Sequence, residues 1–345
     1  MTMIDLRSDT VTRPTAAMRE AMARAEVGDD VYGEDPTVNR LQAVAADWLG
    51  MGGALLVPSG TMGNLASLLA HCGRGDEVIL GDRSHTFLYE QGGIAALGGI
   101  MPHTVPNRPD GTIALVDIRG AIRPDDAHFP RTRLVCLENT HNACNGSPIS
   151  PETTAQVADL AHAHGLRVHV DGARLFNAAV AQGVPARDLV ASVDSVTFCL
   201  SKGLSAPVGA LICGETSFIA EVHRARKVLG GGMRQAGVIA AAGVVALEQM
   251  IDRLAEDHLR ARRLAEGFAE IPGLEVGTVH TNIFYFSLAE DCLLTGEEVA
   301  DGLKTRGVLL PNRTSRKFRA VTHCWIDDAD IEKALAAMRS VMAES

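Results

Sequence analysis

One lysine lies where a lysine is chemically unusual. Lys202 comes almost directly after SVTFCL (195–200), an apolar, β-branched run typical of a buried strand, and Ser201 and Gly203 flank it. A lysine after a strand is most often a solvated loop residue. At the carboxyl edge of a sheet, however, a desolvated lysine loses its proton easily and attacks carbonyl carbons. The rest of the sequence has to decide between these two interpretations.

A carboxylate occupies the matching position one strand earlier. Asp171 ends the run LRVHVD (166–171), and Gly172 and Arg174 follow it. A buried carboxylate is costly unless something compensates it, so Asp171 binds a ligand, pairs with Arg174 or caps a helix. Lys202 comes 31 residues later, about the length of one strand–helix–strand unit. We therefore expect Asp171 and Lys202 to emerge from nearby strands at one edge of a sheet.

Two further features follow earlier strand-like runs. After the run ALLV, the segment PSGTMGN (58–64) contains Ser59, Gly60 and Thr61. A small-residue turn that opens a helix presents N–H groups to a phosphate, although Ser59 or Thr61 could equally be a plain helix cap. His85 follows the next run, EVIL, by five residues, and a lone histidine is more often structural than functional.

Together these residues match the requirements of one cofactor. Pyridoxal phosphate has a phosphate, a flat ring that is stacked, a ring nitrogen whose proton is held, and an aldehyde that a lysine captures. The helix start at residues 58–64, His85, Asp171 and Lys202 offer one partner for each. The sequence therefore predicts a pyridoxal-phosphate site at the carboxyl edge of a sheet.

The order of the elements is consistent with such a sheet. Strand-like runs alternate with helical stretches from about residue 54 to about 215, which predicts an α/β fold with a mostly parallel sheet covered on both faces. Only eight residues separate the runs 195–200 and 209–213. Eight residues are too few for a crossover helix, so this pair should be antiparallel.

The C-terminal part has a different pattern. It begins with a helix-rich stretch over about 215–268 and ends with a helix that Asp327 should cap. Three runs between them predict a second, smaller sheet: 274–288, 307–311 and 318–326. We expect a large cofactor-binding domain over residues 1–249, with an N-terminal arm over 1–15, and a smaller α+β domain over 250–345.

Composition excludes several classes of protein. The net charge is −10, aromatic residues make up 4%, and no basic block occurs, so we expect no nucleic-acid partner. The longest apolar run, 236–247, is too short to span a bilayer, so we expect no membrane association. The N-terminus does not resemble a signal peptide, and the seven cysteines contain no CxxC pair. These features predict a cytoplasmic protein with reduced cysteines and no metal site built from them.

The sequence closely resembles the low-specificity L-threonine aldolases, which are pyridoxal-phosphate enzymes of fold type I, the aspartate-aminotransferase-like class. The resemblance runs nearly from end to end. It rests on these segments: DLRSDTVTRP (5–14), VGDDVYGEDPTVNRL (27–41), PSGTMGN (58–64), LENTHN (137–142), HVDGARLFNA (169–178), LSKGLSAPVGA (200–210), GGGMRQAG (230–237) and RAVTH (319–323).

The resemblance implies a role for each residue that holds the cofactor. Lys202 forms the internal aldimine, Asp171 pairs with the ring nitrogen, and His85 stacks on the ring and is a candidate base. The remaining cofactor-binding residues hold the phosphate or lie beside it: Ser59, Gly60, Thr61, Arg174, and Arg234 from a neighbouring subunit.

The resemblance also implies a substrate site. Ser8, Arg174 and Arg319 hold the substrate carboxylate, and the substrate region is lined by Tyr32, Tyr89 and His128. From its position alone, Arg319 could instead be a surface residue. The carboxylate would then be bound by Arg174 with Arg313 or Arg316.

The implied reaction is retro-aldol cleavage of L-threonine, L-allo-threonine and related β-hydroxy-α-amino acids to glycine and an aldehyde. The base is His85 or a water held by His85 and His128. Alternatives are β-elimination or racemisation on the same scaffold, a catalytically silent cofactor-binding protein, and a nicotinamide oxidoreductase, for which the glycine fingerprint is missing. The resemblance implies a homotetramer of two catalytic dimers. The sequence leaves open the preferred epimer and aldehyde, the physiological direction and whether a cation binds.

Overall fold

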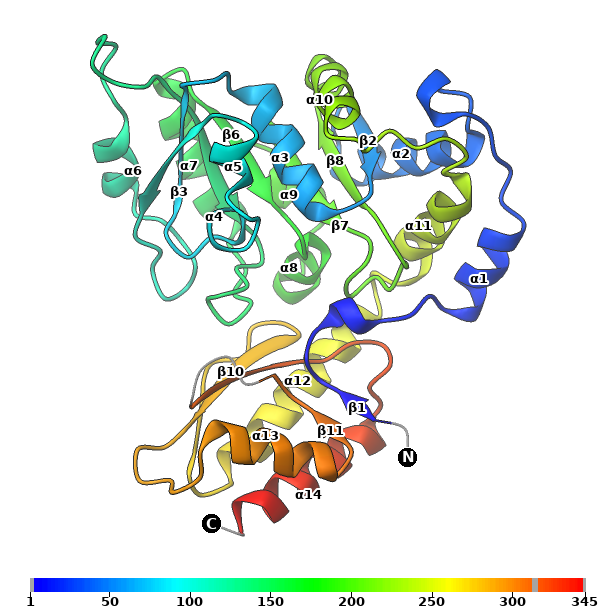
Figure 1. The fold of residues 1–345 in the computed structure, drawn as a ribbon, viewed down its shortest axis with the longest axis vertical. Helices are drawn as coiled ribbons and strands as arrows, with labels where there is room; N and C mark the ends of the chain where they lie inside the picture. Colours follow the sequence, from blue (N-terminus) through cyan, green and yellow to red (C-terminus); the bar gives the residue numbers. More distant parts are fainter. Residues whose placement is uncertain (1–2, 312–315, 344–345) are drawn as a thin grey trace.

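The structure, a computed structural model, describes residues 3–311 and 316–343. A larger body is built around one sheet, and a smaller body lies beneath it, with the N-terminal segment passing from one to the other (Figure 1). No helix within the described residues is long and apolar enough to cross a membrane.

The larger body contains a seven-stranded sheet in which a single strand, β8, runs against the others. The short run between β7 and β8 forces this antiparallel pairing, as the sequence predicts. The strand order is β2 (Gly53–Val57), β8 (Ala210–Gly214), β7 (Ser195–Cys199), β6 (Arg167–Asp171), β5 (Thr132–Glu138), β3 (Glu77–Gly81) and β4 (Met101–Val105). The carboxyl ends of β3, β5, β6 and β7 therefore meet at one edge, near the junction of the two bodies.

Helices cover both faces of this sheet, which is why its strands are almost continuously apolar. One face carries α3 (Gly60–His71), α5 (Gly93–Ala96) and α10 (Thr216–Val228). The other face carries α2 (Pro36–Leu49), α6 (Leu115–Ala121), α7 (Pro151–Ala163) and α9 (Ala186–Val190). The remaining helices of this body are α1 (Ala16–Ala23), α4 (His85–Leu88), α8 (Leu175–Gln182) and α11 (Gly237–Gln249).

The smaller body has a three-stranded antiparallel sheet in the order β12 (Lys317–Val321), β10 (Ile283–Leu288) and β9 (Leu274–Val276). The run 274–288 thus forms two strands, and the run 318–326 is a strand only to Val321. Its helices are α12 (Leu254–Ala269), α13 (Gly296–Thr305) and α14 (Asp328–Met342). Asp327 caps α14 in a reciprocal pair with Asp330, as predicted.

The N-terminal arm packs on the smaller body. β1 (Ile4–Asp5) pairs in parallel with β11 (Val308–Leu309), and Ile4 and Leu6 join the apolar core that α12, α13 and α14 share with the small sheet. The sequence did not predict this pairing, because a two-residue strand has no periodicity to detect. The division of the chain at residue 249 stays a prediction.

Candidate active site

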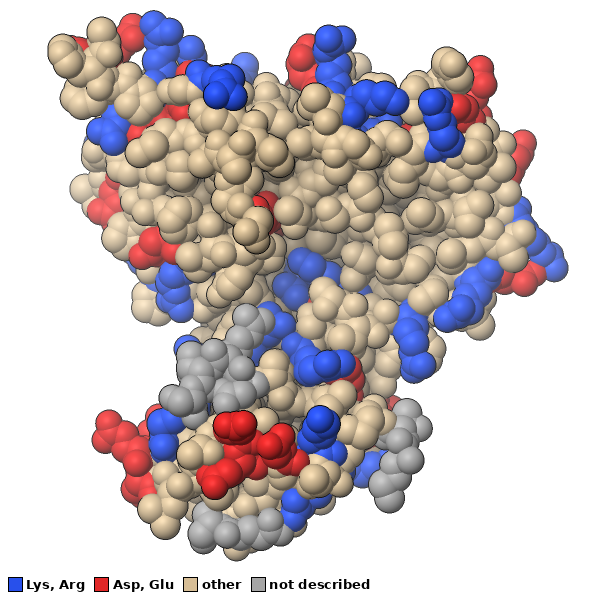
Figure 2. Space-filling view, in the orientation of Figure 1, with Lys and Arg blue, Asp and Glu red and all other residues tan. Residues whose placement is uncertain are grey.

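A pocket of about 230 Å³ lies at the junction of the two bodies, and several of the predicted residues line it. Its wall is formed by Ser8, Thr10, His85, Tyr89, Asn142, Arg174, Lys202 and Arg319. The surface is hollowed at this junction, and Lys and Arg side chains gather there (Figure 2). The structure thus brings together residues that lie up to about 300 positions apart in the chain.

Lys202 lies on a tight turn directly after β7. Its carbonyl oxygen accepts hydrogen bonds from the backbone N–H of Ser205, at 2.8 Å, and from Thr12 Oγ1, at 3.1 Å. The backbone of Ser205 adopts a left-handed conformation, with φ of 63°. The turn is therefore fixed from both sides and directs Lys202 into the pocket rather than leaving it as an ordinary loop residue.

Asp171 ends β6 and is only 4% exposed. Its Oδ2 accepts hydrogen bonds from Asn64 Nδ2, at 3.0 Å, and from Thr86 Oγ1, at 3.4 Å. Its Oδ1 accepts a hydrogen bond from the backbone N–H of Ala173, at 3.1 Å. An ion pair between Asp171 and Arg174, the alternative that the sequence left open, is not formed. Asp171 is thus a buried carboxylate with neutral hydrogen-bond donors around it.

Arg174 pairs instead with Asp9, a residue that the sequence analysis missed. Its Nε and Nη2 atoms each donate to a different oxygen of Asp9, at 2.7 Å, and Asn282 Nδ2 donates to the same carboxylate at 3.2 Å. Burial alone would raise the pKa of Asp9, but the Arg174 guanidinium holds that pKa well below its usual range. A charge-assisted pair with two parallel bonds fixes Arg174 rigidly in the pocket wall.

Arg319 is buried, so its interpretation as a surface residue is wrong. It lies on β12 opposite Tyr285, and it donates to Asn142 Oδ1 at 2.7 Å and to the carbonyl oxygen of Arg7 at 3.0 Å. Arg316 donates to carbonyl oxygens of residues 289 and 292 in the smaller body and does not line the pocket. Arg313 lies outside the described residues.

The turn at residues 58–64 begins α3 as expected. Ser59 is the cap, and its Oγ accepts from the backbone N–H of Met62 at 3.2 Å. A Cβ at Gly60 would lie 2.7 Å from the Sγ of Cys199, at the end of β7, so only glycine lets the helix start approach this edge. Asn64, one turn along α3, reaches Asp171. The N-terminus of α3, with Thr61 in its first turn, therefore lies about one helical turn from the buried carboxylate.

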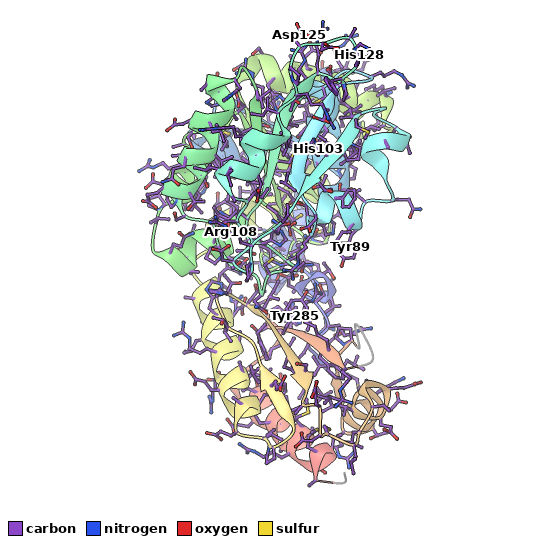
Figure 3. The ribbon with its side chains drawn as sticks, turned by 90° about the vertical axis from the view of Figure 1, so that its left-hand side faces the viewer. Tyr89, His103, Arg108, Asp125, His128 and Tyr285 are labelled. Atoms are coloured by element: carbon purple, nitrogen blue, oxygen red, sulfur yellow. The ribbon has the colours of Figure 1, made fainter. Side chains whose placement is uncertain are left out.

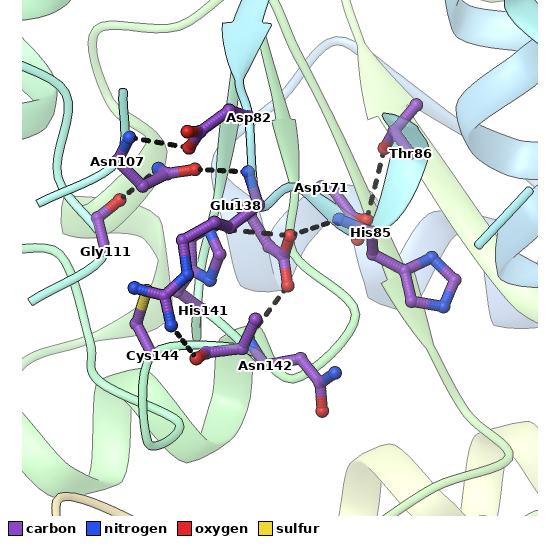
Figure 4. Close-up of polar contacts among 12 residues, drawn as sticks. Asp82, His85, Thr86, Asn107, Gly111, Glu138, His141, Asn142, Cys144 and Asp171 are labelled. Atoms are coloured by element: carbon purple, nitrogen blue, oxygen red, sulfur yellow. Dashed lines mark hydrogen bonds and ion pairs between the residues drawn. The ribbon is translucent and has the colours of Figure 1, made fainter. Parts of the chain in front are cut away.

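His85 begins α4 and is held at two points. Its backbone N–H donates to Glu138 Oε2 at 2.7 Å, and its Nδ1 lies 2.9 Å from Glu90 Oε1. Glu138 also accepts from the backbone N–H of Asn142 at 2.8 Å (Figure 4). The Tyr89 ring lies against His85, with 5.5 Å between ring centroids. Both glutamates were missed; an acidic residue just after the apolar stretch of α4 was the available signal for Glu90.

His85, Glu90 and Asp171 each offer one atom that could bind a metal ion, and these three atoms lie within 4.8 Å of one another. The Asn64 amide nitrogen, however, donates to both carboxylates. An N–H donor at that point disfavours a metal ion. The same arrangement fits pyridoxal phosphate: a helix N-terminus for the phosphate, Asp171 for the ring nitrogen, and Lys202 for the aldehyde.

Three predicted residues lie on surfaces away from this pocket. The His128 side chain is 88% exposed and bonds to Asp126; Figure 3 shows it at the far end of the larger body from Tyr89. Tyr32, at 74% exposed, also lies on the surface. Arg234 pairs with Asp29 at 2.9 Å, on a segment separate from the pocket. The resemblance implies that Arg234 acts in the site of a neighbouring subunit, but it gives no subunit for Tyr32 and His128.

The fold and the pocket define a pyridoxal-phosphate-dependent enzyme of fold type I. Among solved structures, a putative L-allo-threonine aldolase from Listeria monocytogenes has a TM-score of 0.83 at 21% identity and covers 99% of this chain and 96% of its own. A threonine aldolase from Leishmania major has a TM-score of 0.84 at 19% identity, with 98% and 99% covered. A structure of SPT with PLP has a TM-score of 0.73 at 20% identity, with 99% and 88% covered. At such identities these likenesses show the fold alone.

Sequence relatives are much more similar. Low-specificity L-threonine aldolase 1 of Arabidopsis thaliana is 49% identical and covers 99% of this chain and 97% of its own length. The low specificity L-threonine aldolase of Escherichia coli K12 is 44% identical, with 99% and 100% covered. The family model for beta-eliminating lyases matches residues 5–291. The chain belongs to the beta-eliminating lyase family and, within it, to the low-specificity L-threonine aldolases, which are lyases that use pyridoxal phosphate.

Proposed function

We propose that this enzyme cleaves L-threonine, L-allo-threonine and related β-hydroxy-α-amino acids to glycine and an aldehyde. The observation that carries the proposal is the pocket that places Lys202 and His85 beside the two buried arginines, Arg174 and Arg319. The relatives that are 44% and 49% identical carry this activity in their names.

Each part of the cofactor has a partner at the carboxyl edge of the sheet. Lys202 would bind the aldehyde covalently, Asp171 the ring nitrogen, and the backbone at Ser59, Gly60 and Thr61 the phosphate. When bound, pyridoxal phosphate supplies an electron sink for the bond that breaks at the substrate Cα. Asp171 accepts hydrogen bonds from neutral donors and has no arginine partner among the described residues, so its carboxylate can pair with a protonated ring nitrogen.

The substrate carboxylate would lie against Arg319, with Ser8 and Arg174 beside it. A guanidinium holds a carboxylate through two directed bonds, so it fixes the orientation of the substrate as well as its affinity. Correct orientation of the Cα–Cβ bond makes a large contribution to the rate of its cleavage. His85, on the wall of the same pocket, would take the proton of the β-hydroxyl group.

Tyr32, His128 and Arg234 would reach the pocket of a neighbouring subunit in a homotetramer of two catalytic dimers. Support comes from their positions, since each is exposed and remote from the pocket of its own chain. Mixing Lys202→Ala with Arg234→Ala subunits tests the idea. Two inactive proteins should regain up to roughly a quarter of the parental sites if subunits exchange and share residues. No recovery after verified exchange would contradict a shared site.

A cytoplasmic location remains a prediction. All seven cysteines lie within the described residues, and all are unpaired. Reduced thiols are typical of a reducing compartment, and this is the support that the structure offers.

The proposed function is tested by adding L-threonine or L-allo-threonine to the pyridoxal-phosphate-loaded protein and measuring glycine and acetaldehyde. Equal amounts of both products support cleavage, whereas ammonia and a keto acid would indicate elimination. Arg319→Ala should keep the covalently bound cofactor but lose both apparent affinity and turnover, and Arg319→Lys should rescue neither well. Parental kinetics in Arg319→Ala would contradict the proposed carboxylate site.

A further inference from the structure

Two buried carboxylates lie side by side beneath the pocket. Glu90 is 6% exposed and Asp171 is 4% exposed. A single nitrogen, Asn64 Nδ2, donates to both, at 2.9 Å to Glu90 Oε1 and at 3.0 Å to Asp171 Oδ2. Within the described part of the chain, neither carboxylate pairs with a lysine or arginine, and the one ion-pair partner of Glu90 is His85.

This environment is unfavourable for two negative charges. Burial raises the pKa of Glu90, and the nearby Asp171 carboxylate raises it further, against the hydrogen bond from His85. Burial alone would lower the pKa of His85, but Glu90 and Asp171 raise it. The two pKa values are therefore linked, because the hydrogen bond between the groups raises the pKa of His85 and opposes the rise in the pKa of Glu90.

The orientation of Asn64 follows from its neighbours. If its amide were reversed, a carbonyl oxygen would face two carboxylates, so Nδ2 must point to them and Oδ1 must accept from the other side. Oδ1 lies 3.4 Å from His169 Nε2, which is therefore the protonated nitrogen of that ring. Burial lowers the pKa of His169 to about 3, so this ring is neutral and its Nδ1 accepts.

The hydrogen bonds on the other side of His169 agree with this tautomer. Ser195 Oγ lies 2.9 Å from His169 Nδ1 and donates to it, and it accepts from His71 Nε2 at 2.7 Å. Burial lowers the pKa of His71 to about 4, so it too is neutral near pH 7. Every donor from His71 to Asn64 thus points towards the two carboxylates.

The tautomer of His85 follows from its contact with Glu90. With Glu90 ionised, its Oε1 accepts a hydrogen bond from Asn64 and can only accept from His85 as well, so the Nδ1 that lies 2.9 Å from it donates. In neutral His85 the lone pair then resides on Nε2. Nε2 is the atom that a proton acceptor in the pocket requires.

We propose that Glu90 is a positioning residue of this active site, which holds His85 with its proton on Nδ1 and leaves Nε2 as the proton acceptor, while Asn64 holds Glu90. The proposal rests on the proposed function, in which His85 takes the β-hydroxyl proton. The other titratable groups that face His85 or Glu90 are Asp171, Lys202, Glu138, Tyr89 and Cys136. Arg174 and Arg319 line the same pocket.

Two substitutions separate the charge of Glu90 from its acceptor oxygen. Glu90→Gln keeps an oxygen for His85 Nδ1 but loses the charge, so the pKa of His85 should fall. The acidic limb of the cleavage rate should then move to lower pH. Glu90→Leu removes both features, so His85 should populate both tautomers and turnover should fall roughly 100-fold or more.

A matched control exists at the opposite edge of the sheet. Glu77 is also buried and also faces a histidine, His103, at 3.3 Å, but it is held by Arg123. Glu77→Gln should leave the His85 tautomer and the pH profile unchanged. Covalent binding of pyridoxal phosphate to Lys202 reports whether each variant is folded.

The tautomer is measured by nitrogen-15 NMR of the histidine side chains, in cofactor-free and cofactor-loaded protein. A His85→Gln protein identifies the His85 signal among the 12 histidines. The expected parental result is an Nδ1–H form above the pKa of His85. An Nε2–H form in the parent, or an unchanged His85 pKa and acidic limb in Glu90→Gln, would overturn the proposal. Absence of threonine cleavage by the parent would contradict the proposed function instead, because the tautomer is read independently of activity.

Discussion

Acidic residues have different partners at the two ends of the strands in the seven-stranded sheet. At the amino edge, Glu77 pairs with Arg123 at 2.8 Å and faces His103, while Asp194 pairs with Arg167 at 2.7 Å and with His162 at 2.9 Å. Glu77 and Asp194 thus each have both an arginine and a histidine. At the carboxyl edge, among the described residues, Asp171 and Glu90 have only histidine, amide and hydroxyl partners.

This difference separates structural charges from chemical ones. An acid that an arginine neutralises contributes to folding and has little capacity left for a ligand. An acid left with neutral donors costs folding free energy, but no arginine or lysine occupies it, so a cationic partner such as a protonated ring nitrogen can pair with it. The carboxyl edge is therefore the reactive one, and substitutions at the two edges should affect different observables.

The largest effect is expected at Lys202. Lys202→Ala should lose covalent pyridoxal phosphate and nearly all turnover, because no other group in the pocket can take over the attachment to the aldehyde. Lys304→Ala, at an exposed position on α13, is the control and should match the parent in both. Cleavage at the parental rate by Lys202→Ala would contradict the claim that the reaction takes place at the carboxyl edge of the sheet.

Asp171→Asn should come next. The shape is kept but the charge is lost, so turnover should fall by about 3 kcal/mol of transition-state stabilisation. The free energy of unfolding should stay the same or rise, because one of two neighbouring buried carboxylates is removed. Rates are followed by glycine release and stability by urea unfolding. A loss of stability with unchanged turnover would show that Asp171 stabilises the fold, as Glu77 does, and has no role in the reaction.

Glu77→Gln should show the opposite pattern. It leaves Arg123 without its acid, and because the Arg123 side chain is 32% exposed, the expected loss of unfolding free energy is only about 2 kcal/mol. Turnover per folded subunit should not change. Stability is measured by urea unfolding and turnover by glycine release on the same samples. A loss of turnover at parental stability would contradict a purely structural role for Glu77.

The smallest effect concerns pH. Burial would raise the pKa of Asp194, but hydrogen bonds from His162, the backbone of Val168 and Arg167 lower it overall. A lowered pKa stabilises the fold above the unfolded value near 4 and loses that contribution as pH falls through the folded value. Asp194→Asn should therefore cost about 1 kcal/mol at pH 7. The difference from the parent should shrink below about pH 4, and a difference that grows on acidification would contradict the sign.

Much of the fold could be predicted because strands and helices leave local patterns. The apolar runs from 54 to 213 identify every strand of the large sheet except β4, and the short connection before 209 gives the antiparallel pair. β4 is the end strand of this sheet and is only partly buried, so it has no continuous apolar run. The prediction of the small sheet was less accurate. The run 274–288 breaks where β9 ends and β10 begins, and beyond Val321 the chain forms no strand, although Ile326 is buried. Pairing of β1 with β11 depends on tertiary packing that two residues do not encode.

The site was predictable where strand ends and motifs identify it, as for Lys202 and Asp171. Its supporting residues were not, because their partners lie far away in sequence. Asp9 and Arg174 are 165 positions apart, and Asn64 and Asp171 are 107 apart. Nothing local distinguishes Asp9 from an exposed acid in the N-terminal arm.

The account depends most directly on where the cofactor attaches. The protein is loaded with pyridoxal phosphate, reduced with borohydride and digested, and the modified peptide is sequenced by mass spectrometry. The account predicts one stoichiometric adduct per chain, on Lys202, which disappears in Lys202→Ala but persists in Arg319→Ala. A stoichiometric adduct on another lysine, or none at all, would contradict the assignment of the carboxyl edge as the active site.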